Sequence, residues 1–239
     1  MVCMHQVSPI KGRGFVAKNF KKTLRLLKKN NAIIYAAGIS NSKIKSKSAL
    51  KREINEIKNF RKYLDKKTLI YISTCSVNDN SRNKSLYVKN KIKIENFIKK
   101  NFNKFIILRF PELVGKSNNP NTLFNYFKNK IKNKKKFSIF TGVKRNLLDI
   151  DDAIKISKFI IKNKKNCNKI FNVINKHFYN PLKIVKIFET ELKVKANYTI
   201  VKKKKKKWKM NYKQIHKIVA QANINFDYNY CEKLIKKYC

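Results

Sequence analysis

Short apolar runs alternate along the chain with longer segments in which apolar residues recur at helical spacing. The short runs, rich in β-branched and aromatic residues, predict buried strands over Val2–Ile10, Ala32–Ala37, Thr68–Ser73, Phe105–Phe110, Phe137–Thr141 and Ile170–Ile174. The periodic segments predict helices over Gly14–Lys29, Ser48–Leu64, Tyr87–Asn101, Thr122–Asn133, from the cap Asp152 to about Lys162, and from Asn180-Pro181 onward. Because strands alternate with helices, the pattern predicts an α/β fold with a doubly wound parallel sheet.

The formal net charge of +46 is typical of proteins that bind nucleic acid through phosphate contacts. Only seven of the 59 basic residues are Arg, the side chain favoured for bidentate phosphate and base recognition, and the lysines are spread along the whole chain. We interpret the charge mainly as the product of A/T-rich codons and expect no nucleic-acid partner. The strongest polyanion candidate is Lys202–Lys207 with Trp208 and Lys209, and a solvated low-complexity run is the simpler interpretation.

Composition also bounds the class of protein. Apolar residues make up 43% of the chain and include 16 Phe, which excludes wholesale disorder. The five cysteines form no CxxC pair, so the sequence indicates neither a disulfide framework nor a metal site. No apolar run is long enough to cross a bilayer, and Met1–Ile10 lack the pattern of a signal peptide. We therefore expect a cytoplasmic protein.

Two of the five glycines fall within Lys11–Ala17 (KGRGFVA), at the start of the first predicted helix. Gly12 permits a tight strand-to-helix turn, Gly14 lets the backbone approach a pyrophosphate, and the small Ala17 lets the helix lie close to the strand. The pattern predicts a cradle for the phosphates of a dinucleotide. A simple glycine turn before a surface helix is the alternative.

A hydroxyl, a phenol and an ammonium group follow the strand expected at Thr68–Ser73. Thr74 ends this strand, and Tyr87 and Lys91 share one face at the start of the next helix. An adjacent ammonium lowers the pKa of a phenol from about 10 and brings it into the range of acid–base catalysis. We interpret the three as a catalytic set in which Thr74 holds the substrate oxygen, Tyr87 exchanges its proton and a nicotinamide exchanges hydride.

The alternative is that Tyr87 only packs at the start of its helix. The same Tyr-Lys spacing recurs at Tyr63, Tyr126, Tyr179 and Tyr198. Only Tyr87 follows a hydroxyl cluster at a strand end within an alternating α/β pattern, so we favour the catalytic interpretation there.

On these residues the chain resembles the NAD-dependent epimerase/dehydratase family of extended short-chain dehydrogenases/reductases, which act on nucleotide-linked sugars. The resemblance runs from about Ile10 to Asn175 and includes Leu108–Gly115, similar to the strand and loop beneath the nicotinamide. It implies a Rossmann-like fold, NAD or NADP as cofactor and a nucleotide-sugar substrate, and it leaves a homodimer open. It implies a cofactor site made by Gly12, Arg13, Gly14, Phe15, Val16, Ala36, Ala37, Gly38, Lys91 and Pro111.

The resemblance further implies a substrate side to the site, with Thr74 at the reacting sugar and Arg145 at the diphosphate. A surface base in a basic protein is an equal alternative for Arg145.

The chain departs from the family pattern in three ways. An Asp or Glu about 20 residues after the glycine turn accepts hydrogen bonds from the adenosine ribose in NAD-binding units, whereas the first acidic residue here is Glu53. The first helix leads almost directly to Ala32, so the first half of the sheet is shortened. With the acid missing, Arg13 facing a ribose 2′-phosphate would favour NADP, and weak binding of a dinucleotide is the equal alternative. Cys75 and Ser76 stand where dehydratases place an Asp-Glu pair, which argues against elimination of water and leaves a reductase or an epimerase.

We expect residues 1–175 to form an NAD(P)-binding Rossmann-like domain, with 112–148 contributing to the substrate side, and residues 176–239 to form a small C-terminal substrate cap. One alternative function is a catalytically weak or inactive member of the same fold that binds cofactor or sugar nucleotide. The other is a binder of nucleic acid or membrane surfaces through the lysine run.

Overall fold

The structure is a computed structural model, and it describes residues 8–42, 44–62, 64, 66–79, 85–203 and 212–239. Its elements are β1 (Ile10–Lys11), α1 (Phe15–Phe20), η1 (Lys21–Thr23), α2 (Leu24–Lys29), β2 (Ala32–Tyr35), α3 (Lys47–Arg61), β3 (Thr68–Thr74), η2 (Cys75–Asn78), α4 (Leu86–Asn101), β4 (Phe105–Phe110), β5 (Glu112–Val114), α5 (Leu123–Lys132), β6 (Phe137–Thr141), β7 (Leu147–Asp149), α6 (Ile150–Lys162), η4 (Lys164–Asn166), β8 (Lys169–Asn172), α7 (Pro181–Leu192), β9 (Tyr198–Lys202), α8 (Lys213–Gln221) and α9 (Tyr230–Tyr238). Most of the strand expected at Val2–Ile10, and most of the lysine run, lie outside the described residues.

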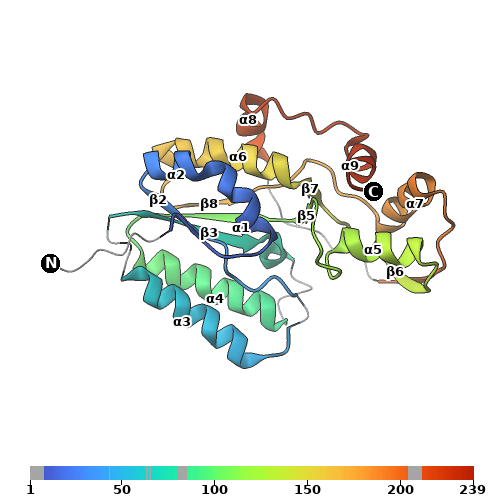
Figure 1. The fold of residues 1–239 in the computed structure, drawn as a ribbon, viewed down its shortest axis with the longest axis horizontal. Coiled ribbons are helices and arrows are strands. Elements are labelled where there is room, and N and C mark those ends of the chain that lie inside the picture. The colour runs from blue at the N-terminus through green and yellow to red at the C-terminus, as the bar shows by residue number, and fades with distance from the viewer. Residues whose placement is uncertain (1–7, 43, 63, 65, 80–84, 204–211) are drawn as a thin grey trace.

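Five parallel strands form the central sheet in the order β1-β2-β3-β4-β8. Helices α1, α2, α6 and α8 cover one face of the sheet, and α3 and α4 cover the other (Figure 1). The predicted α/β fold with helices on both faces of a parallel sheet is therefore confirmed. Strand β1 lies at the edge of this sheet, because no described strand pairs with its outer side.

Each face of the sheet packs into its own hydrophobic core, which explains why the strands read as nearly continuous apolar runs. Ile34 and Ile70 belong to the core on the α6 side, whereas Tyr35 and Tyr71 on the same two strands belong to the core against α3 and α4. Alternate residues thus serve opposite faces.

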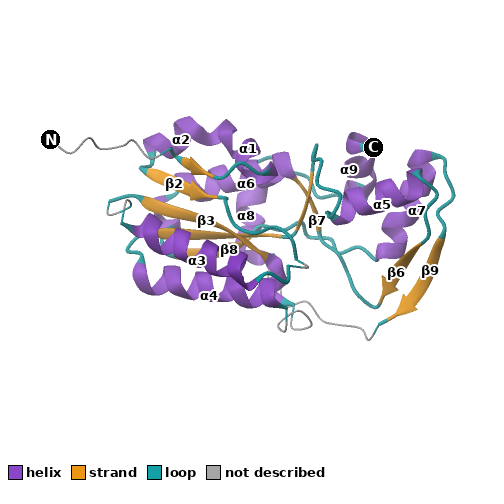
Figure 2. Cartoon of the chain, turned by 60° about the horizontal axis from the view of Figure 1, so that its bottom comes forward, coloured by secondary structure: helices purple, strands orange, loops and turns teal. Residues whose placement is uncertain are grey.

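A second, smaller layer adjoins the sheet. It consists of the parallel pairs β5–β7 and β6–β9, with α5 and α7 packed beside β6 and β9 (Figure 2). The C-terminal segment contributes to both parts, since α8 contacts β8 and α6 whereas α7 contacts α5 and β6. None of the described helices is long and apolar enough to cross a bilayer.

Two helices begin at other caps than the sequence suggests. Helix α3 is capped by Ser46, whose hydroxyl accepts the Ala49 N–H at 3.2 Å, and Ser48 lies in its first turn. Helix α6 is capped by Asp149, which accepts the Asp151 N–H at 2.8 Å. The preferred cap Asp152 was therefore wrong.

Instead of capping, Asp152 accepts a hydrogen bond from the hydroxyl of Tyr230 in α9 at 2.7 Å. The same tyrosine oxygen accepts the Asp149 N–H at 2.9 Å, and Lys237 forms ion pairs with Asp149 at 2.8 Å and Asp151 at 3.0 Å. We call these five residues, which include Asp151, the C-terminal clamp. It ties α9 to the start of α6.

Lys237→Met is expected to weaken this clamp by about 1 kcal/mol at neutral pH, because the ion pairs are half-exposed. Hydrogen bonds from Lys237 and Lys22 lower the pKa of Asp151. The ionised Asp151 carboxylate therefore contributes to the free energy of unfolding above its unfolded pKa near 4, and this contribution is lost as the pH falls through the lower folded pKa. Urea unfolding of both proteins at several pH values should show a difference at pH 7 that shrinks below about pH 4. A difference that persists at acid pH would contradict this account.

Candidate active site

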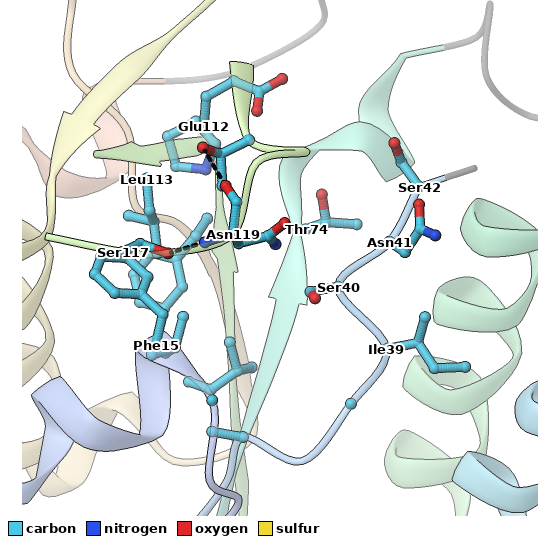
Figure 3. Close-up of a pocket in the computed structure, with 18 of the residues that line it drawn as sticks. Phe15, Ile39, Ser40, Asn41, Ser42, Thr74, Glu112, Leu113, Ser117 and Asn119 are labelled. Carbon is cyan, nitrogen blue, oxygen red and sulfur yellow. Dashed lines mark hydrogen bonds between the residues drawn. The ribbon is translucent and has the colours of Figure 1, made fainter. Parts of the chain in front are cut away.

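A cleft of about 700 Å³ opens at the carboxyl ends of the strands, where ligands bind in open parallel sheets. The glycine turn, the segment after β2, the end of β3 and the loop after β4 line this cleft. We call the segment Gly38–Ser42 the strap. Figure 3 shows Thr74 with strap residues on one side and the loop residues Ser117 and Asn119 on the other.

The two glycines of the turn serve different purposes. Gly12 has a φ of +135°, and a Cβ there would lie 2.6 Å from the carbonyl oxygen of Ala36, so the close approach of β1 and β2 requires glycine. Gly14 has a φ of −75° and a Cβ there would meet nothing within 4 Å. Open space therefore lies in front of Gly14 at the cleft, and the phosphates of a dinucleotide fit such a cradle.

The structure brings most of the expected cofactor residues to this cleft. Arg13, Gly14, Phe15, Val16, Ala36, Gly38, Lys91 and Pro111 line it. Gly12 and Ala37 are not among the lining residues, and they lie against each other, because a Cβ on Gly12 would be 3.0 Å from the Ala37 nitrogen. Arg13 is exposed, so its guanidinium is accessible to an anion.

Thr74, Tyr87 and Lys91 converge on the same cleft. The Thr74 hydroxyl oxygen accepts the Ser76 N–H at 3.1 Å and caps the short helix η2, so its own proton remains to be donated to another acceptor. Tyr87 is nearly buried near the start of α4, and the Lys91 Nζ lies 5.8 Å from its ring centroid. The i, i+4 pair therefore shares one face of α4, as the spacing predicts.

Lys91 forms a buried ion pair that the sequence interpretation missed. Its Nζ lies 2.8 Å from Oε1 of Glu53, and both side chains are 3% exposed. A Cβ on Gly38 would lie 2.5 Å from that carboxylate and 2.6 Å from the ammonium, so the strap begins directly over the pair. The signal was present in the sequence, because Glu53 falls between Leu50 and Ile57 on the apolar stripe of α3.

Glu53 gathers three further donors. Tyr71 donates to it at 3.1 Å, Asn90 at 3.2 Å and the backbone N–H of Ile39 at 3.2 Å. Burial and the Glu53 charge raise the pKa of Tyr71, so its hydroxyl stays protonated, donates to Glu53 and accepts from Lys91 at 3.2 Å. A charged group at such depth needs partners of this kind.

A second ion pair, with a buried carboxylate and a partly buried guanidinium, joins α4 to β4. The Arg109 Nε donates to Glu95 at 3.0 Å, and the Ser73 hydroxyl donates to the same carboxylate at 2.6 Å. The thiol of Cys75 donates to the carbonyl of Arg109 at 3.2 Å, and burial raises the pKa of this thiol. Cys75 therefore stays protonated and is part of the core.

The far wall of the cleft carries Arg145. Its guanidinium lies 3.5 Å from Glu112, and its backbone pairs with that of Tyr179, so it is not an isolated surface base. The neighbouring loop is organised by Asn125, whose amide donates to the carbonyls of Ser117 at 2.7 Å and Asn119 at 2.8 Å. No group of three or more metal-ligating side chains occurs within the described part of the chain.

Known proteins agree with this architecture. The sequence profile of the NAD dependent epimerase/dehydratase family matches residues 15–173. No curated protein matches the chain significantly. Similar solved structures include UDP-glucuronic acid 4-epimerase from Bacillus cereus in complex with UDP-glucuronic acid and NAD (19% identity, TM-score 0.70, covering 90% of this chain and 76% of that one). They also include RMD from Pseudomonas aeruginosa complexed with NADPH (13%, 0.74, 94% and 95%) and UDP-N-acetylglucosamine 4-epimerase from Bacillus cereus (14%, 0.70, 96% and 93%). Since the profile matches well over half of the chain, the chain belongs to the NAD dependent epimerase/dehydratase family.

Proposed function

We propose that the chain binds a nicotinamide cofactor at the glycine turn and oxidises or reduces a nucleotide-activated sugar in the cleft. The observation that carries the proposal is the convergence of Thr74, Tyr87 and Lys91 on one cleft with the Gly14 cradle. Similar structures bind NAD, NADPH and UDP-glucuronic acid, which supports the same ligand classes here. The bound nicotinamide would supply the hydride acceptor or donor.

The chain's own residues would perform the proton chemistry. Thr74 would donate its hydroxyl proton to the reacting sugar oxygen, and Tyr87 would exchange a proton with that oxygen. Lys91 would fix the position of α4 at the site through its hydrogen bonds to Glu53 and Tyr71. Arg145 would bind the diphosphate of the substrate in place of part of its contact with Glu112.

The arrangement favours epimerisation or reduction over dehydration. Elimination of water needs an acid–base pair beside the sugar, but Cys75 is a buried thiol and Ser76 is the residue next to it on the cleft wall. Among the residues that line the cleft, the carboxylate is that of Glu112, which is paired with Arg145.

A second candidate function is cofactor or sugar-nucleotide binding without turnover. The catalytic interpretation needs the positive charge of Lys91 to act on the phenol of Tyr87. The buried Glu53 carboxylate neutralises that charge, and this observation favours the second candidate. Saturable binding of NADH or NADPH without turnover of any sugar nucleotide would distinguish it.

The cofactor part of the proposal is tested by charge at Gly14. Asp and Asn are both good helix caps, and a Cβ at position 14 meets no atom within 4 Å, so Gly14→Asp and Gly14→Asn should both fold. We expect Asp to weaken NADH and NADPH binding at least about tenfold more than Asn, because only Asp repels a diphosphate. Calorimetric titration gives the dissociation constants, and thermal melts check the fold. Equal binding by the two variants, or no saturable binding by the wild type, would contradict the proposal.

A further inference from the structure

The central sheet stops at the strand that leads into the glycine turn. β1 pairs with β2, and no other strand of the described residues pairs with β1. In a doubly wound dinucleotide-binding sheet the strand order reverses beside this strand, and the dinucleotide lies across the reversal. This sheet extends from β1 in one direction only, so it provides the walls for one half of a dinucleotide.

The chain between the first helices and β2 contains no strands that could form the missing half of the sheet. Helix α2 ends at Lys29 and β2 begins at Ala32, so only Asn30 and Asn31 connect them. A further crossover to a parallel strand needs at least about 10–12 residues. The chain therefore has no strand that could stand beyond β1 in this interval.

The connections between the first three strands also indicate that the strands beyond β1 are missing. The connections from β1 to β2 and from β2 to β3 run in the same direction across the sheet, yet α1 and α2 lie on one face and α3 on the other (Figure 1). Two parallel crossovers of this kind have opposite hands, although about 98% of such connections are right-handed. The chain thus changes face, as a doubly wound sheet does, without the strands at which the order would reverse.

The acid that would hold the adenosine ribose is also committed elsewhere. The first acidic residue after the glycine turn is Glu53. It is 3% exposed and bonded to Lys91, Tyr71, Asn90 and the backbone of Ile39, so its carboxylate is not available to a ribose. Among the residues of Lys11–Ala17 that line the cleft, the charged one is Arg13, and its side chain is exposed.

We propose that the site binds the nicotinamide ribose and the phosphates of its cofactor and leaves the adenosine in solvent beyond β1. This inference rests on the proposed function and specifies which part of the cofactor the protein recognises. The adenosine then adds little affinity, and a 2′-phosphate adds only the charge attraction of Arg13. Reduced nicotinamide mononucleotide, which lacks the adenosine half, should be nearly as good a ligand as the dinucleotide.

The test compares four ligands on the full chain by calorimetry and nicotinamide fluorescence. We expect NADH to bind less than about tenfold more tightly than reduced nicotinamide mononucleotide, the margin left to the second phosphate. ADP and inorganic pyrophosphate should compete with NADH equally within about threefold, because the adenosine makes no contact. NADPH should exceed NADH by about fivefold or less, and Arg13→Ala or high salt should remove that margin.

The outcomes separate the two proposals. NADH that binds more than about tenfold more tightly than the mononucleotide, or ADP that competes far better than pyrophosphate, would show that the protein contacts the adenosine. Either result overturns this inference and leaves the proposed function standing. If none of the nicotinamide ligands binds, the proposed function fails and this inference fails with it. Gly14→Asp should weaken NADH and the mononucleotide by similar factors, because both place a phosphate at the turn.

Discussion

Tyr87→Phe is expected to lower turnover of a sugar nucleotide by a factor of about 10²–10⁴, the contribution of a positioned proton-transferring group. The substitution removes the phenolic oxygen and leaves the nearly buried ring in place, so the fold and cofactor affinity should be unchanged. Turnover is measured across a panel of UDP- and dTDP-sugars, with the oxidised cofactor for epimerisation or oxidation and with NADH or NADPH for reduction. The ratio of the turnover rates, with equal cofactor dissociation constants, isolates the hydroxyl.

The chain offers a matched control for this experiment. Tyr126 has the same spacing to a lysine, and the Lys130 Nζ lies 5.9 Å from its ring centroid, close to the arrangement at Tyr87 and Lys91. Tyr126 is not among the residues that line the cleft. Tyr126→Phe should therefore retain turnover within about twofold. Similar effects of the two substitutions, or near-normal turnover by Tyr87→Phe, would exclude Tyr87 as the catalytic acid–base.

Glu53→Gln is expected to lower the free energy of unfolding by about 3–5 kcal/mol, because it leaves the buried ammonium of Lys91 without its counter-charge. For a chain of this length that corresponds to a fall in Tm of roughly 10 °C. Urea and thermal unfolding measure it. Glu56→Gln, one turn further along α3, is the control, because the Glu56–Arg52 ion pair is exposed and should contribute less than about 1 kcal/mol. The Gln oxygen can still accept the hydrogen bond that Tyr35 donates to Glu56 at 2.9 Å.

A double variant separates the charge from the packing. Glu53→Gln with Lys91→Met removes both charges and keeps similar volumes. The Gln oxygen can still accept from the donors that surround Glu53, so the double variant should be more stable than Glu53→Gln alone. A loss below about 1 kcal/mol in Glu53→Gln would show that Lys91 does not depend on this carboxylate. The double variant should also lack turnover if Lys91 fixes the position of α4 at the site.

The sequence predicted the strands and helices of the sheet because their signals are local. The apolar run Phe105–Phe110 forms β4 with those bounds, and the Asn180-Pro181 start of α7 is confirmed by the Asn180 side chain that accepts the Leu182 N–H. Neighbouring hydroxyls compete for a helix start, which is why the cap of α3 was misplaced from Ser46 to Ser48.

The partners of the site residues could not be predicted in the same way, because they join distant segments. Glu53 and Lys91 lie 38 positions apart, and Asp152 and Tyr230 lie 78 positions apart. Spacing within a helix shows which residues share a face but not which charge they meet. The clustering of Thr74, Tyr87 and Lys91 could be predicted, since each follows a parallel strand or opens the next helix and therefore lies at the same edge of the sheet.

The C-terminal clamp has a consequence for the order of folding during synthesis. Lys237 binds Asp149 across 88 positions, whereas β2 pairs with β3 and β3 pairs with β4, in each case across one α-helix. Short-range contacts of this kind can form early on the ribosome, but long-range ones must wait. The strands β2 to β4 can therefore assemble on the nascent chain, while the start of α6 exposes the surface meant for α9 until that helix emerges from the exit tunnel.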